Sequence, residues 1–88
     1  MLEKMVRISQ DAGLHLRPAA DVCTLAMNYS STIYIYIRDR QYNAKSLLSV
    51  LSAGIKEGEN IRLVITGSDE DQAMGAMLHL LENGKKIS

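Results

Sequence analysis

The segment from Thr32 to Ile37 places the strongest constraint on the fold, because its side chains alternate strictly. Three isoleucines occupy every second position, and two tyrosines lie between them. Successive side chains of a β-strand point to opposite faces, so this segment predicts a strand with one apolar face. Residues 61–66 alternate in the same way. Strands that need cover on one face only are typical of an antiparallel sheet.

Two longer segments have apolar side chains at three- and four-residue spacing, which predicts amphipathic helices. The first runs from about Leu16 to Met27. Pro18 falls in its first turn, where a missing N–H is tolerated. The second follows Ser68 and the acidic residues 69–71, which supply an N-cap and an acidic first turn, and is expected to end at Gly84.

Three shorter elements complete the predicted order β-α-β-β-α-β-α. Residues 2–8 and 41–43 are expected to form short strands, and a short helix should begin after Ser46 and close near Gly54. Because each strand has only one consistently apolar side, the helices must cover that side. The prediction is a single α+β domain over residues 1–88, with a four-stranded antiparallel sheet, three helices on one face and the other face open to water.

Composition excludes several classes of function. Basic and acidic side chains number ten each, so the chain lacks the positive charge typical of nucleic-acid binding. Cys23 is the single cysteine and cannot form an internal disulfide. No apolar stretch approaches the roughly 20 residues that span a bilayer, and no signal-peptide pattern opens the chain. We therefore expect a cytoplasmic protein, monomeric by default, that inserts into no membrane.

Residues 13–20 read Gly-Leu-His-Leu-Arg-Pro-Ala-Ala and place a histidine and an arginine at the start of the first helix. The first N–H groups of a helix are unpaired, so the backbone of Leu16 and Arg17 can bind phosphate. The Arg17 guanidinium adds further donors. A histidine with the usual pKa of about 6.5 is largely neutral in a cell, and its ring nitrogen can attack phosphorus. Such a pair is also common on ordinary solvated surfaces, so these residues alone leave both interpretations open.

The same segment resembles the active-site signature of the HPr family, the phosphocarrier proteins of the bacterial phosphoenolpyruvate:sugar phosphotransferase system. The family pattern is Gly-Leu/Ile-His-Ala/Thr-Arg-Pro-Ala-Ala/Thr, from which this chain departs only at Leu16. The resemblance extends to residues 43–48, to Gly54, Gly58 and Gly67, and to the acidic start of the last helix. It implies an open-faced β-sandwich, the architecture expected above.

The resemblance also implies a function. His15 would accept a phosphoryl group from Enzyme I, which is charged by phosphoenolpyruvate, and pass it to IIA domains of sugar permeases. Arg17 would stabilise the phosphate. The chain would be a carrier rather than an autonomous enzyme, with no metal or organic cofactor of its own, because donor and acceptor proteins complete the site. The expected docking surface for these partners consists of Leu16, Ala20, Leu47, Leu48 and Leu51.

Ser46 has two compatible interpretations. Its hydroxyl can cap the short helix, which is typically worth about 1 kcal/mol. Residues 45–48 also resemble the segment that HPr kinase/phosphorylase modifies with ATP in low-GC Gram-positive members of the family, where the product binds a transcriptional regulator. Phosphorylation there would add roughly −1.5 to −2 charges at a helix N-terminus.

Four positions, one within the signature and three outside it, depart from what is common in the family. Ala12 has no side-chain donor where Ser or Asn is common, Leu16 is bulky, and Thr24 and Met27 stand where basic residues often help docking. These departures fit a specialised paralogue. One alternative is a regulatory relative that acts through Ser46 and the leucine surface while the histidine is idle. Another is a ferredoxin-like binding module with a similar β-α-β-β-α-β core, which has no need of the histidine motif.

Overall fold

The computed structural model describes residues 1–9 and 13–83 and has the predicted element order. The predicted end of the last helix at Gly84 lies outside the described residues. The elements are β1 (Leu2–Arg7), α1 (Leu16–Ala26), β2 (Thr32–Ile37), β3 (Arg40–Asn43), α2 (Leu47–Ser52), β4 (Asn60–Thr66) and α3 (Glu70–Asn83). In the described part of the chain, no helix is long and apolar enough to cross a membrane.

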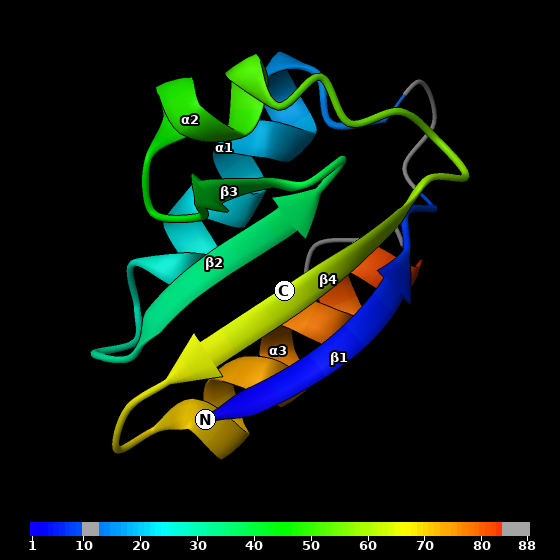
Figure 1. The fold of residues 1–88 in the computed structure, drawn as a ribbon. Helices are drawn as coiled ribbons and strands as arrows, with labels where there is room; N and C mark the ends of the chain where they lie inside the picture. Colours follow the sequence, from blue (N-terminus) through cyan, green and yellow to red (C-terminus); the bar gives the residue numbers. More distant parts are fainter. Residues whose placement is uncertain (10–12, 84–88) are drawn as a thin grey trace.

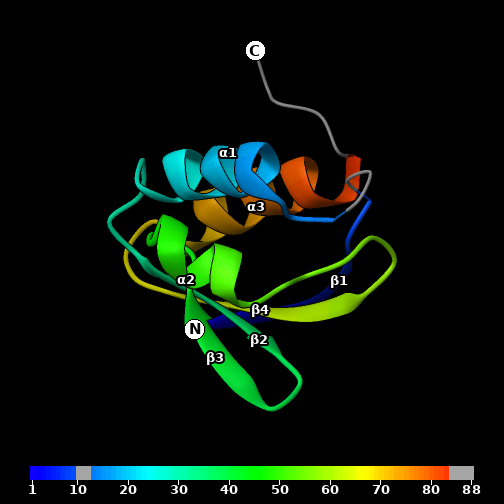
Figure 2. The same ribbon diagram turned by 90° about the horizontal axis from the view of Figure 1, so that it is seen from above.

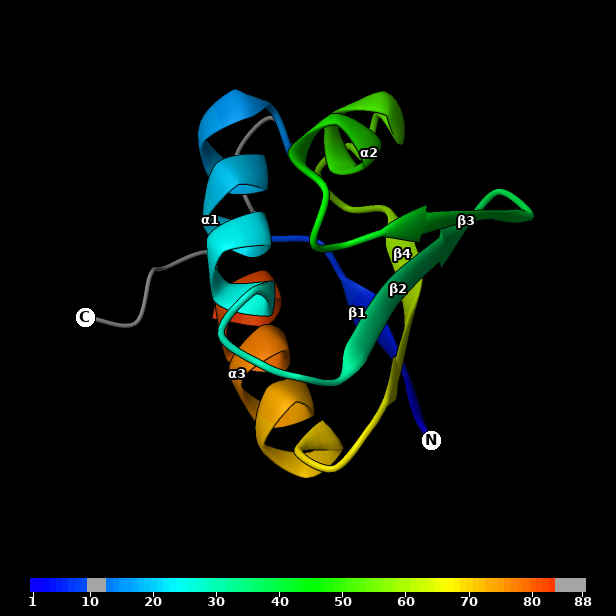
Figure 3. The same cartoon turned by 90° about the vertical axis from the view of Figure 1, so that its left-hand side faces the viewer.

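The four strands form one antiparallel sheet in the order β1-β4-β2-β3 (Figure 1). The register places Ile65 of β4 opposite Ile33 of β2, so the apolar side chains of neighbouring strands share one face. Helices α1 and α3 lie side by side over that face (Figures 2 and 3). Helix α2 packs against α1 and β3. The predicted α+β architecture with an open-faced sheet is confirmed.

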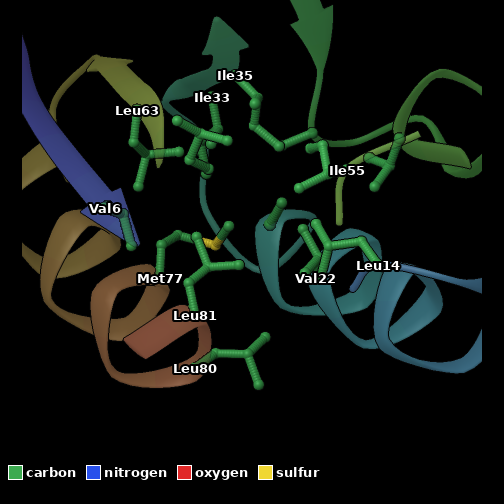
Figure 4. Packing of buried hydrophobic residues seen from close by; sticks show 14 of the residues in the cluster. Val6, Leu14, Val22, Ile33, Ile35, Ile55, Leu63, Met77, Leu80 and Leu81 are labelled. Carbon is green, nitrogen blue, oxygen red and sulfur yellow. The ribbon is translucent and has the colours of Figure 1, made fainter. Parts of the chain in front are cut away.

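The core lies between the sheet and the helix layer (Figure 4). The isoleucines that alternate in the sequence point into the core, and the buried apolar side chains of α3 pack against them from the helix layer. Removing this apolar surface from water is the main driving force for the fold. Side chains with 0 or 1% exposure include Val6, Val22, Ile33, Ile35, Ile61, Leu63, Ile65, Met77 and Leu81.

The other face of the sheet is open, as its polar residues predicted. The Arg62 guanidinium carbon lies 4.6 Å from the centroid of the Tyr36 ring. Arg62 also forms an ion pair of 3.5 Å with Glu3 on the neighbouring strand. Both charged side chains are nearly half exposed, so this pair contributes little to stability.

The turn between β2 and β3 has no glycine, yet Arg38 and Asp39 adopt positive φ angles of 50° and 63°. Two such residues in succession form the turn type that suits a two-residue hairpin. The Arg38 side chain offsets the cost of these positive φ angles. Its guanidinium donates to the Ala53 carbonyl and pairs with Glu59 at 2.5 Å. Hydrogen bonds from the Lys56 N–H and from Arg38 lower the pKa of Glu59.

Asp39→Gly is expected to raise the free energy of unfolding by about 0.5 kcal/mol, because glycine adopts a positive φ without strain. Arg38→Gly relieves the same strain but removes the bonds to Ala53 and Glu59, so it should destabilise the protein. Urea unfolding of both variants measures the difference. A loss of stability in Asp39→Gly equal to that in Arg38→Gly would contradict this account.

Asp69 fastens the start of α3 to the segment between α1 and β2. Its carboxylate accepts hydrogen bonds from the Ser31 hydroxyl, from the Ser30 N–H at 2.9 Å and from the Ser31 N–H at 3.0 Å. These bonds, led by the Ser31 hydroxyl, lower the pKa of Asp69 from 3.8 to about 2. Glu70 instead turns back and accepts from the Gly67 N–H at 3.1 Å, in the manner of a capping box.

The stabilisation by Asp69 is expected to depend on pH. The unfolded carboxyl titrates near 3.8 and the folded one near 2, so the unfolded state binds more protons between these values. The Asp69 carboxylate therefore stabilises the fold fully above the pKa of the unfolded state, and this stabilisation is lost as the pH falls toward 2. Urea unfolding should show a larger gap between wild type and Asp69→Ala at pH 7 than at pH 3. An equal gap at both values would show that the charge plays no part.

Candidate functional site

His15 occupies the N-cap position of α1, with an extended backbone at φ −77° and ψ −169°. Its carbonyl accepts the N–H of Ala19 at 2.9 Å and so starts the helix. Its side chain makes no capping hydrogen bond and is exposed. The N–H groups of Leu16 and Arg17 have no intrahelical acceptor, because they belong to the first turn. The ring therefore lies free beside backbone donors that suit an anion.

The segment before His15 is held by direct contact between backbones. The Leu14 N–H donates to the Ile55 carbonyl at 2.8 Å. Gly13 has a φ of +77°, and a Cβ atom on it would lie 2.2 Å from the Ile55 oxygen and 2.6 Å from the Lys56 Cα. Leu14 itself is buried beside Val22, with Ile55 across from it (Figure 4). His15 is thus the exposed residue between a buried anchor and a helix.

Arg17 is exposed in the first turn of α1. Its guanidinium makes no hydrogen bond or ion pair with residues 1–9 or 13–83. A guanidinium without a protein partner can turn its donors toward an anion at the helix N-terminus without first breaking another bond. His15, Arg17 and the free N–H groups thus all belong to the N-cap and first turn of α1.

Helices α1 and α2 lie beside each other (Figure 3). The Leu14–Ile55 hydrogen bond joins them at one end, and the Cys23 thiol donates to the Lys45 carbonyl at 3.1 Å near the other. Cys23 is half-buried at this helix contact rather than deep in the core. Ser46 begins α2 at the end away from Ile55, so the two predicted phosphorylation sites lie at opposite ends of α2.

The predicted docking residues form a partly exposed apolar surface on these two helices. Leu48 is 78% exposed and Leu16 62% exposed. Ala20 is half-buried, and Leu47 and Leu51 are half-buried against the core. Of the three leucines of α2, Leu48 thus points away from the core, while Leu47 and Leu51 pack partly against it.

The Ser46 hydroxyl caps α2, because its oxygen accepts the N–H of Ser49 at 3.2 Å. The capping interpretation of this residue is confirmed. The hydroxyl of Ser49 in turn accepts the N–H of Asn43 at 2.9 Å. On the other side, the Lys45 ammonium donates to the Tyr29 carbonyl at 2.6 Å and ties the start of α2 to the end of α1.

Of the four positions that depart from what is common in the family, Ala12 lies outside the described residues. Leu16, Thr24 and Met27 are all exposed, so the outer face of α1 is neutral at each of them. Nowhere in the described ranges do three His, Cys, Asp or Glu side chains gather closely enough to bind a metal ion.

Two shallow hollows lie elsewhere on the surface. One, of about 410 Å³, is lined by Arg7, Glu57 and Glu82 among others. The second, of about 560 Å³, lies on the open face of the sheet beside Tyr36 and Arg62. Neither of these two hollows is lined by a predicted site residue.

The match to a known protein family covers almost the whole chain. Residues 2–83 match the family model described as "PTS HPr component phosphorylation site". The chain belongs to the HPr family. The geometry at His15 fits this assignment, because the residues of the signature meet at the start of α1. Membership supports a phosphocarrier role in the phosphotransferase system.

Individual relatives agree with the family assignment. The chain is 37% identical over 82 residues to the HPr-like protein Crh of Halalkalibacterium halodurans, covering 93% of this chain and 98% of that protein. It is 35% identical to the phosphocarrier protein HPr of Treponema pallidum, over 94% of each chain. The crystal structure of an HPr from Thermoanaerobacter tengcongensis superposes with a TM-score of 0.91 at 34% identity, covering 99% of this chain and 100% of that one.

The contact of Gly13 with Ile55 and Lys56 was not predicted from the sequence. This contact joins segments that are distant in the chain, and no local pattern marks it. The glycine in the motif was the available signal, since a glycine before a helix often marks a positive φ or a close approach of two backbones.

Proposed function

We propose that this protein is a phosphocarrier in which His15 accepts a phosphoryl group from Enzyme I and passes it to IIA domains of sugar permeases. The observation that carries the proposal is the exposed His15 ring at the N-terminus of α1, beside unpaired N–H groups and a free Arg17 guanidinium. The family assignment supports the same role.

The transfer step follows from this geometry. The unprotonated ring nitrogen of His15 forms a bond to phosphorus while the bond from phosphorus to the donor breaks, and the electron pair of that bond leaves with the donor atom. The N–H groups of Leu16 and Arg17 and the Arg17 guanidinium bind the phosphoryl oxygens. Passage to the acceptor reverses the same step. This chain supplies the carrier atom, and the partners supply the rest of the site.

A partner that reaches His15 must also cover the apolar surface beside it. Leu16 and Leu48 are the most exposed side chains of that surface, so burying them supplies much of the binding energy. We infer that Enzyme I and the IIA domains share this docking surface, which also includes Ala20, Leu47 and Leu51. Thr24 and Met27 add no charge, which points to a specialised set of partners.

Regulatory phosphorylation of Ser46 is the second candidate function. Its support is the position of Ser46 at the start of α2 and the similarity to an HPr-like protein named Crh. A phosphate on Ser46 keeps an acceptor oxygen near the Ser49 N–H while changing the charge of the neighbouring leucine surface. The partners would then be an HPr kinase/phosphorylase and a transcriptional regulator.

One experiment separates the two functions. The protein is incubated with Enzyme I and phosphoenolpyruvate, and in parallel with HPr kinase/phosphorylase and ATP. The carrier role predicts acid-labile phosphate in the first reaction that disappears in His15→Ala and persists in Ser46→Ala. Label in the kinase reaction alone would favour the regulatory relative over the carrier.

We also infer that the carrier acts in the cytoplasm as a monomer. One similar structure, at 34% identity and a TM-score of 0.76, is described as an HPr dimer of T. tengcongensis. Light scattering of the purified protein decides between the two states. A mass near 9.7 kDa is the expected result, and twice that mass would contradict it.

A further inference from the structure

Lys56 lies directly against the segment that carries His15. A Cβ atom on Gly13 would lie 2.6 Å from the Lys56 Cα and 2.9 Å from its carbonyl carbon, so the two backbones are in contact. His15 follows Gly13 by two residues, a span of at most about 7.6 Å between Cα atoms. The fold therefore brings the backbone of a basic residue from the α2–β4 connection against the segment that carries the candidate phosphoryl acceptor.

Hydrogen bonds fix the backbone of Lys56, while its side chain is exposed. Its N–H donates to Glu59 Oε1 at 2.7 Å, and the preceding carbonyl of Ile55 accepts from Leu14. The side chain is exposed, and its ammonium forms no hydrogen bond or ion pair with any residue that the structure describes. The nearby Lys56 charge is one of the lesser causes of the lowered pKa of Glu59, whose carboxylate is paired with Arg38. The four-carbon stem of Lys56 can thus swing its charge toward His15.

We propose that Lys56 is a second cationic phosphate-binding residue, which acts with Arg17 on the phosphoryl group carried by His15. This inference rests on the proposed carrier function. Arg17 approaches the phosphoryl group from α1 and Lys56 approaches it from the α2–β4 connection, so the group is bound by two separate segments. A lysine supplies a compact point charge with three donors, which suits the open geometry of a surface site.

The test compares Lys56→Met with Lys4→Met, which removes the same charge from an exposed residue of β1, at the far edge of the sheet from β3. Phosphorylation by Enzyme I should slow about threefold to tenfold in Lys56→Met and remain unchanged in Lys4→Met. Lys56→Arg should restore most of the rate, because the charge is retained. Equal rates for the two methionine variants would overturn the proposal.

A second readout does not depend on Enzyme I. The NMR titration midpoint of the His15 ring in the unmodified protein should rise by about 0.2 to 0.5 pH unit in Lys56→Met at low salt, because a nearby cation disfavours the imidazolium. Lys4→Met should leave the midpoint unchanged, and a midpoint unchanged in both variants would overturn the proposal. Failure of Enzyme I to label wild type would instead refute the carrier function, while the titration still decides whether the Lys56 charge acts on His15.

Discussion

Gly13→Ala is expected to lower the free energy of unfolding by about 2 to 4 kcal/mol. The new methyl group would lie 2.2 Å from the Ile55 oxygen and 2.6 Å from the Lys56 Cα, and both are backbone atoms that cannot move aside cheaply. The φ of +77° adds strain for any residue with a Cβ. Relief of the clash requires separation of the two segments and loss of the Leu14–Ile55 hydrogen bond. Urea unfolding measures the loss.

Gly75→Ala is the matched control for this substitution. Gly75 lies within α3, and a Cβ atom on it would meet nothing within 4 Å. Alanine should therefore stabilise the helix by about 0.5 to 1 kcal/mol. The free energy of unfolding is therefore expected to fall in Gly13→Ala and to rise in Gly75→Ala. A Gly13→Ala protein as stable as wild type would show that the His15 segment does not rest on Ile55 and Lys56.

Arg17→Ala is expected to slow phosphorylation by Enzyme I about a hundredfold. The substitution removes the guanidinium that binds the developing charge on the phosphoryl oxygens. The melting temperature should change little, because Arg17 is exposed and makes no hydrogen bond or ion pair with the described residues. The measurements are kcat/KM for phosphorylation and Tm from thermal unfolding of the same preparation.

Arg17→Lys is the control that separates charge from geometry. Lysine retains the charge but lacks the planar pair of donors, so the rate should recover only in part. Full recovery would show that charge alone suffices at this position. A loss of Tm in Arg17→Ala that matched the loss of rate would contradict a phosphate-binding role and make Arg17 structural.

The fold was largely predictable because its signals are local. The alternating isoleucines of β2 give that strand and its buried face without reference to any other element. The order of the strands, with β4 between β1 and β2, was not predictable in this way, because strand pairing depends on contacts between distant segments. The turn at Arg38 and Asp39 could not be read from composition, since the residues there are not the usual ones and side-chain bonds to other elements hold them.

In the candidate site too, local features were predictable from the sequence and those that depend on tertiary contacts were not. His15 and Arg17 are neighbours in the sequence, so the motif predicted their meeting at a helix start. The cap at Ser46 was predictable for the same reason. The side chain that stays most exposed on α2 is Leu48, which spacing alone could not distinguish in so short a helix. Lys56 carries no motif signal, because only the tertiary contact with Gly13 brings it to the site.

The carrier role of His15 is tested by locating the phosphate on wild-type protein after reaction with Enzyme I and phosphoenolpyruvate. Mass spectrometry at neutral pH should find one phosphoryl group, on His15, which is lost in acid and transferred when an IIA domain is added. His15→Ala, an exposed position without side-chain bonds to the described residues, should fold normally and take up no phosphate. Phosphate on any other residue, or none on wild type with Enzyme I from several bacteria, would contradict the account.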